Sequence, residues 1–198
     1  EDVAKLKQGA VVVGFLRPLD EPEQLQPMLE RGVSAFAVEL IPRSTRAQAM
    51  DALSSMATIV GYKAVVLAAD QVPRMFPMLT TAAGTVPPAK VLVLGAGVAG
   101  LQAIATARRL GAVVEGFDVR AAAGEAVRSL GAKFLEIDMG GQSGEGAGGY
   151  AREVTEEVMD RSRELIAKQA KVTDCIITSA AVPGRKAPIL ITEDAVRN

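Results

Sequence analysis

The stretch Val91-Leu-Val-Leu-Gly-Ala-Gly-Val-Ala-Gly100 decides the fold class of this 198-residue chain. Four apolar residues suited to a buried strand lead directly into a Gly-x-Gly-x-x-Gly turn, and an apolar stretch with helical character follows. In such a turn Gly95 allows the tight bend, Gly97 lets the backbone approach a pyrophosphate, and Gly100 lets helix and strand pack closely. The amino terminus of the helix supplies N–H groups and a positive dipole for phosphates. The stretch therefore predicts a dinucleotide site, the alternative being a glycine-rich turn without a ligand.

Regular alternation of strands and helices surrounds this turn. Alternation of this kind predicts a parallel sheet with right-handed crossovers, which is the doubly wound, Rossmann-like α/β architecture. We expect strands at 90–94, 113–118, 134–137 and 174–178, and helices at 98–110, 121–130 and 150–170.

The residues before the turn predict part of a second α/β domain. A strand is expected at 9–16, a helix at 21–32, a strand at 33–38 and a long helix from Arg46 to about Ala69, with a seam at 82–89. The polar stretch after Pro42 has a plain reading as a helix start with Ser44 or Thr45 as its N-cap. The predicted organisation is a partial α/β domain at 1–42, a loop and helix start at 43–55, and a nucleotide-binding domain with its linking helix at 56–198.

An acidic residue ends the second strand of the predicted sheet. Asp118 lies about 20 residues beyond the glycines, where a carboxylate accepts hydrogen bonds from the ribose hydroxyls of NAD and repels a 2′-phosphate. Arg120 is the competing signal, because an arginine nearby can hold that phosphate, although a solvated or adenine-stacked guanidinium is the plain alternative. We favour NAD over NADP. Ser179 and Ala180, at the carboxyl end of the last strand, are small enough to leave room for the dinucleotide or are simply a strand exit.

Composition narrows the classes of function. The net charge is −1 with both signs interleaved, which disfavours nucleic acid as a partner. A single cysteine, Cys175, excludes a disulfide within the chain and a zinc cluster, and we expect no metal site. The apolar run 57–69 is broken by Lys63 and is too short to span a bilayer, so we expect a soluble chain. The first residues do not resemble a natural start, so we expect a fragment.

Several long motifs carry a resemblance to a known family. The chain resembles the NAD(H)-binding component of proton-translocating nicotinamide nucleotide transhydrogenases, which are related to alanine dehydrogenases. By this resemblance the chain lacks parts of both ends of the family's sequence. The motifs lie at 42–55, 61–64, 82–100, 117–120, 148–151 and 183–188.

The resemblance implies direct hydride transfer from bound NADH to NADP held on a separate domain, with a membrane component coupling the transfer to proton translocation. It also implies a homodimer that is cytoplasmic and peripheral on the inner face of the plasma membrane, or on the matrix side if mitochondrial. Gln48 is expected to reach toward the partner nucleotide, and Tyr150 to close a mobile loop at 139–150 over the site. The remaining residues that the resemblance implies are Arg43, Asp51 and Ser54 at the nicotinamide and its ribose, Val98 and Asp118, Val119 and Arg120 around the pyrophosphate and adenosine, and Gly148 near the nucleotide.

Two other classes of function stay open. An amino-acid dehydrogenase needs a general acid/base, and Arg17 stands about where alanine dehydrogenases carry their catalytic histidine, in a chain that has no histidine. That absence favours transhydrogenation, in which no separate proton moves. A regulatory module that binds nucleotide without chemistry would need only the glycines and Asp118.

Overall fold

The computed structural model describes residues 2–146, 151–152, 154–181, 184 and 186–197. The chain divides into two compact units, one of residues 1–56 with 183–185 and one of residues 57–182 with 186–198.

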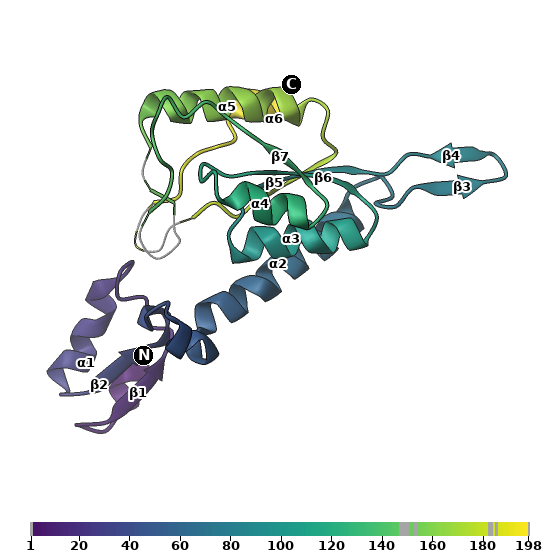
Figure 1. The fold of residues 1–198 in the computed structure, drawn as a ribbon. Coiled ribbons are helices and arrows are strands. Elements are labelled where there is room, and N and C mark those ends of the chain that lie inside the picture. Colours follow the sequence, from purple (N-terminus) through teal and green to yellow (C-terminus); the bar gives the residue numbers. More distant parts are fainter. Residues whose placement is uncertain (1, 147–150, 153, 182–183, 185, 198) are drawn as a thin grey trace. The chain divides into compact units, whose positions relative to one another are not determined.

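A four-stranded parallel sheet forms the centre of the second unit. The elements around it are β5 (Lys90–Leu94), α3 (Val98–Arg109), β6 (Val113–Phe117), α4 (Ala123–Ser129), β7 (Lys133–Leu135), α5 (Glu156–Ala170), β8 (Cys175–Thr178) and α6 (Glu193–Arg197). The strands lie in the order β7-β6-β5-β8, with α3 and α4 on one face and α5 and α6 on the other (Figure 1). Helices on both faces of a parallel sheet confirm the predicted doubly wound α/β class.

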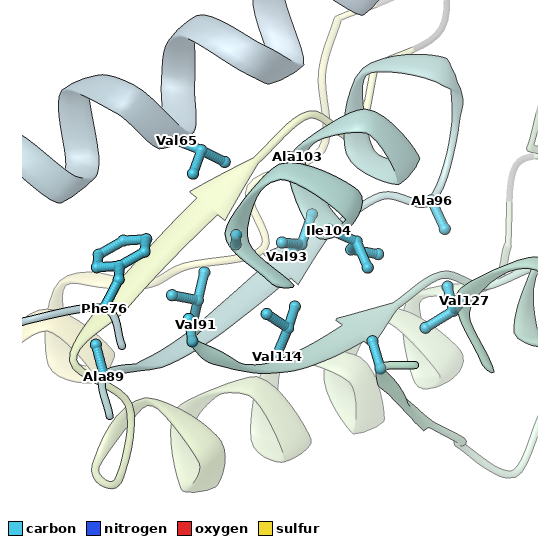
Figure 2. Packing of buried hydrophobic residues seen from close by; sticks show 13 residues of the cluster. Val65, Phe76, Ala89, Val91, Val93, Ala96, Ala103, Ile104, Val114 and Val127 are labelled. Atoms are coloured by element: carbon cyan, nitrogen blue, oxygen red, sulfur yellow. The ribbon is translucent and has the colours of Figure 1, made fainter. Parts of the chain in front are cut away.

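The central strand β5 is buried on both faces because its apolar residues alternate between two cores. Val91 and Val93 point toward the face covered by α3, where Figure 2 shows them beside Ile104. Leu92 and Leu94 point the other way, into the cluster that includes Ile166 of α5. Each fully buried side chain of this size contributes roughly 1.5–3 kcal/mol of transfer free energy. The sheet therefore holds the glycine turn on a rigid support.

The long helix α2 (Ala52–Gln71) packs on the sheet's helical layer through Gly61 and Val65. A Cβ at Gly61 would lie 2.1 Å from the Ala99 carbonyl oxygen of α3, so only glycine permits this approach. Val65 is fully buried in the same layer (Figure 2). Contrary to the expectation drawn from residues 57–69, α2 is long and apolar enough to cross a membrane by length and composition alone. A single such helix is weak evidence for a span.

A β-hairpin replaces the seam expected at 82–89. Strands β3 (Leu79–Thr81) and β4 (Gly84–Val86) pair in antiparallel fashion, and the hairpin projects from the second unit in Figure 1. Its tight turn is fastened by the Thr81 hydroxyl, which accepts from the Ala83 N–H and donates to the Gly84 carbonyl.

The first unit contains a two-stranded parallel sheet and several short helices. The strands β1 (Val11–Gly14) and β2 (Ser34–Ala37) are shorter than the predicted runs. The predicted helix at 21–32 is divided into a 3-10 turn and the short helix α1. The helical elements are η1 (Asp2–Lys5), η2 (Pro22–Leu25), α1 (Gln26–Glu30), η3 (Val38–Leu40) and η4 (Thr45–Met50).

Three further boundaries differ from the sequence-based expectation. The helix expected from Arg46 is instead η4 followed by α2, with a break at Asp51, whose ψ of 79° is not helical. The helix expected from residue 150 begins at Glu156, after Thr155 in an extended conformation. The strand expected at 134–137 is β7, which ends at Leu135.

Candidate functional site

The three motif glycines have three different environments in the turn between β5 and α3. Gly95 has φ of +92°, and a Cβ there would lie 2.8 Å from the Ala180 amide nitrogen. A Cβ at Gly100 would lie 1.7 Å from the Gly95 carbonyl oxygen, so helix and turn touch directly. At Gly97 a Cβ would meet nothing within 4 Å. The fold itself therefore requires glycine at the first and third positions and leaves open space at the second.

Ser179 and Ala180 brace the turn from the neighbouring strand end. The Ser179 N–H donates to the Leu94 carbonyl at 2.8 Å, and its hydroxyl donates to the Gly95 carbonyl at 3.1 Å. Ala180 is the residue that the tight bend at Gly95 approaches. These contacts hold the turn in place, and a direct role for either residue in cofactor binding stays a prediction.

The Asp118 carboxylate follows β6 and is saturated with hydrogen bonds. Oδ2 accepts from the Ala96 N–H at 2.7 Å, which ties the carboxylate to the glycine turn. Oδ1 accepts from the Arg120 N–H at 2.9 Å. The Arg120 guanidinium adds two more, Nε to Oδ1 at 2.9 Å and Nη2 to Oδ2 at 2.8 Å. A carboxylate has about four acceptor positions, and all of them are used.

The pairing with Arg120 keeps Asp118 ionised although it is largely buried. Burial by itself would raise the pKa of Asp118, but the hydrogen bonds from Arg120 and Ala96 outweigh that effect and lower the pKa below its ordinary value. Only 15% of the Arg120 side chain and 6% of the Asp118 side chain are exposed. The reading of Arg120 as a solvated guanidinium is therefore wrong, since it lies across the carboxylate.

The glycine-rich segment after β7 packs against this same turn. A Cβ at Gly144 would lie 2.2 Å from the Val119 carbonyl oxygen, and the Gly144 carbonyl accepts from the Arg152 N–H at 2.8 Å. The Glu145 carboxylate accepts from the Ala122 N–H at 3.3 Å. Sequence reasoning missed Gly144 and Glu145, because only the fold brings residues 144 and 119 together. Gly148 and Tyr150 lie outside the described residues.

Arg43, Asp51 and Ser54 come together in the first unit, as the sequence analysis grouped them. The Asp51 carboxylate accepts from the Ser54 N–H at 2.8 Å and from its hydroxyl at 2.7 Å. The Arg43 guanidinium donates to the Ser54 hydroxyl at 3.1 Å and lies 3.8 Å from the Asp51 carboxylate. Hydrogen bonds from Ser54, with the charge of Arg43, lower the pKa of Asp51.

Asp51 is also the side chain that caps α2. Its bond to the N–H of the third helical residue is the usual N-cap geometry, whereas Ser44, expected as a cap, makes no side-chain capping bond at η4. Gln48 lies on η4 and is exposed, and within the described part of the chain its side chain makes no hydrogen bond. The structure therefore groups Arg43, Asp51 and Ser54 and leaves Gln48 apart.

Glu39 clamps the loop after β1 and was not anticipated from the sequence. Its Oε1 accepts from the N–H groups of Leu16, at 2.8 Å, and of Arg17. Arg17 has φ of +52°, a left-handed conformation that costs energy for a residue with a side chain. Burial alone would raise the pKa of Glu39, but these backbone bonds lower it. The clamp holds Arg17 at the position where alanine dehydrogenases are expected to carry histidine.

Metal-binding side chains do not gather in the part of the chain that the structure describes. There, no three cysteine, aspartate or glutamate side chains are placed to share an ion. Cys175 lies half-buried on β8, and burial followed by the nearby Asp174 charge raises the pKa of its thiol. A raised pKa leaves the thiol protonated and a poor nucleophile.

Two family descriptions match the chain and together cover almost all of it. The description "Alanine dehydrogenase/PNT, N-terminal domain" matches residues 1–60, and "Alanine dehydrogenase/PNT, C-terminal domain" matches residues 64–198. The chain belongs to the alanine dehydrogenase/PNT family. This membership confirms the resemblance drawn from the motifs.

Individual relatives differ in how closely they match. The chain is 51% identical to an NAD(P) transhydrogenase subunit alpha of Rhodospirillum rubrum, over 99% of this chain and 51% of the relative. It is 27% identical to an alanine dehydrogenase of Methanococcus maripaludis, over 97% of this chain and 46% of that protein. Its fold matches the crystal structure of a transhydrogenase from Sinorhizobium meliloti with a TM-score of 0.86 and 46% identity, over 99% of this chain and 52% of the other. The chain thus spans about half the length of these relatives.

Proposed function

We propose that this chain belongs to the NAD(H)-binding component of a proton-translocating transhydrogenase, in which hydride passes directly between NADH and NADP⁺ held on a partner domain. The glycine turn and Asp118 would hold the pyrophosphate and the adenosine ribose. The greater identity to the transhydrogenase subunit than to the alanine dehydrogenase supports this choice within the family.

The observation that carries the proposal is the open space at Gly97 between two glycines that the fold closes tightly. Packing alone accounts for Gly95 and Gly100, because a Cβ at either would collide with backbone. Packing does not account for Gly97, whose N-cap position before α3 is exposed and unobstructed. A pyrophosphate that lies against the backbone N–H groups of a helix amino terminus would account for it. The anionic Asp118 at the end of the next strand favours NAD.

Arg43, Asp51, Ser54 and Gln48 are proposed to position the nicotinamide end. Bound NADH would supply the hydride, and transfer between two nicotinamides releases no separate proton, so the protein's task is alignment and the exclusion of water. The hydrogen bonds among Arg43, Asp51 and Ser54 hold a charged donor and a hydroxyl in fixed positions. Gln48, unengaged by its own neighbours, is the side chain proposed to reach the second nucleotide, and Tyr150 is proposed to close over the site.

The test is a cyclic hydride-exchange assay on the full subunit that contains this chain, with and without the NADP(H)-binding component. We expect exchange only when both are present. Gln48→Asn should slow exchange much more than it weakens NADH binding, because it disturbs geometry at the reacting ring alone. Gln24→Asn, at an exposed glutamine of η2, is the matched control. Oxidation of an amino acid by NAD without the partner would establish a dehydrogenase instead, and absence of exchange with bound NADH would leave a regulatory module.

The proposed partners follow from the same function. They are the NADP(H)-binding domain, a membrane component that couples hydride transfer to proton movement, and a second copy of the subunit. The proposed location is the cytoplasmic face of the plasma membrane, or the matrix side in a mitochondrion, through the membrane component. Light scattering of the purified subunit tests for the homodimer, and co-sedimentation with membranes that contain the partner tests the attachment.

A further inference from the structure

The Arg120 guanidinium and a ribose diol need the same acceptor positions on Asp118. Two of the four hydrogen bonds to the carboxylate come from backbone N–H groups of Ala96 and Arg120, which the turn holds in place. The other two come from the guanidinium. A diol that donates two hydrogen bonds to this carboxylate therefore has to displace the guanidinium, whereas the backbone bonds can remain.

A displaced guanidinium needs another acceptor, and Glu145 is the acidic group beside it. Hydrogen bonding to Asp118 and the charge of that carboxylate raise the pKa of Arg120, and the charge of Glu145 adds to them. The Glu145 carboxylate has capacity to spare, since its hydrogen bond within the described residues is the long one from the Ala122 N–H, at 3.3 Å. Glu145 is held near the turn because Gly144 packs against the Val119 carbonyl oxygen and residues 145 and 151 form a β-bridge.

We propose that Glu145 is a specificity-determining residue, which takes the Arg120 guanidinium when a ribose diol displaces it from Asp118. The inference rests on the proposed nucleotide site and adds a residue to it. While Glu145 holds the guanidinium, Asp118 faces the ribose as an uncompensated anion and Arg120 is withheld from any 2′-phosphate. Without Glu145, Arg120 is available to pair with a 2′-phosphate, and the preference for an unphosphorylated ribose declines.

The test compares two adenosine ligands that differ by one phosphate. Binding of 5′-AMP and of adenosine 2′,5′-bisphosphate to the full subunit is measured by titration calorimetry at one ionic strength, for the wild type and for Glu145→Gln. We expect Glu145→Gln to shift the ratio of the two dissociation constants about tenfold toward the bisphosphate, equivalent to ~1.4 kcal/mol. Two changes contribute, weaker binding of 5′-AMP and tighter binding of the bisphosphate.

Three variants distinguish this role from a general loss of charge or structure. Glu136→Gln removes an exposed glutamate that pairs with Arg128 elsewhere, and should leave the ratio unchanged. Glu145→Asp keeps an acceptor and should retain most of the wild-type ratio. In the double variant Glu145→Gln/Arg120→Gln the tenfold shift should disappear, because no guanidinium remains to meet the 2′-phosphate.

An unchanged ratio in Glu145→Gln overturns the inference, and so does a shift that persists in the double variant or that Glu136→Gln reproduces. In each of these results 5′-AMP still binds the wild type, so the proposed nucleotide site stands. Failure of the wild-type subunit to bind 5′-AMP at all would overturn that site and the inference together.

Discussion

Alanine substitutions at Gly97 and Gly100 should fail in opposite ways, although the two glycines lie in one turn. A Cβ at Gly100 would lie 1.7 Å from the Gly95 carbonyl oxygen and 3.0 Å from the Ser179 hydroxyl. Both obstacles are part of the bend that holds β5 and α3 together, and neither is the end of a flexible side chain that swings away. At Gly97 a Cβ would meet nothing within 4 Å, and the φ of −80° suits any residue.

The magnitudes follow from these two environments. Overpacking costs about 1–3 kcal/mol, and the severity of the clash puts Gly100→Ala at ~3 kcal/mol or above. For a chain of this size that corresponds to a fall in melting temperature of roughly 6–12 °C. Gly97→Ala should change the free energy of unfolding by less than ~0.5 kcal/mol. It should weaken NADH binding about tenfold to a hundredfold, because hydrogen bonds to a charged group contribute ~1.5–3 kcal/mol.

The assay pairs urea unfolding with NADH titration calorimetry on the full subunit. Gly97→Ala is expected to unfold at the wild-type urea concentration and to bind NADH poorly, and Gly100→Ala to unfold early. Unchanged NADH affinity in Gly97→Ala would refute the reasoning, since the open space at that position would then serve no pyrophosphate. Equal destabilisation by the two substitutions would refute the packing argument.

Three further predictions concern single contacts. Asp51→Ala should lower the free energy of unfolding by about 1 kcal/mol through loss of the α2 cap, and Asp51→Asn by less, as urea titration can check. Because the pKa of Asp118 is lowered by folding, its contribution to stability is fully present above its unfolded pKa of about 3.9 and is lost as the pH falls through the lower folded value. Asp118→Asn should therefore flatten the acid limb of stability against pH, and an unaltered limb would remove Asp118 as its source. Gly61→Ala should cost roughly 2 kcal/mol or more in thermal unfolding, because its Cβ would lie 2.1 Å from the Ala99 carbonyl oxygen and would separate α2 from α3.

Those parts of the fold that depend on local pattern were predictable from the sequence. The strand at 90–94 coincides with β5, and the helix expected at 98–110 differs from α3 by one residue. Both are apolar and bounded by glycine, so periodicity and turn chemistry agree. The alternation that follows them was sufficient for the doubly wound class, which needs element order and not exact boundaries.

The elements that were missed carry weak local signals. In the β3–β4 hairpin the paired residues Thr80 and Thr85 and the small residues between them resemble a linker ahead of two prolines. The five-residue helix α6 is too short for a periodic pattern. The break at Asp51 was hidden because a 3-10 turn and an α-helix have similar periods, and only the dihedral angles separate η4 from α2.

The site shows the same division between local and long-range information. Spacing alone assigned Asp118 to the ribose and made Arg120 a separate, ambiguous signal. The structure joins them, because both guanidinium bonds end on the carboxylate that a ribose would need. It also adds Glu145, which is 25 residues from Arg120 in sequence and reaches the turn only because Gly144 has no side chain to keep it away from Val119. A carboxylate that stays ionised under an arginine, with a second carboxylate beside that arginine, can respond to a ribose in a way that neither acid can alone. The proposed preference for NAD is accordingly a property of the three side chains together, and substitution of Asp118 alone would measure only part of it.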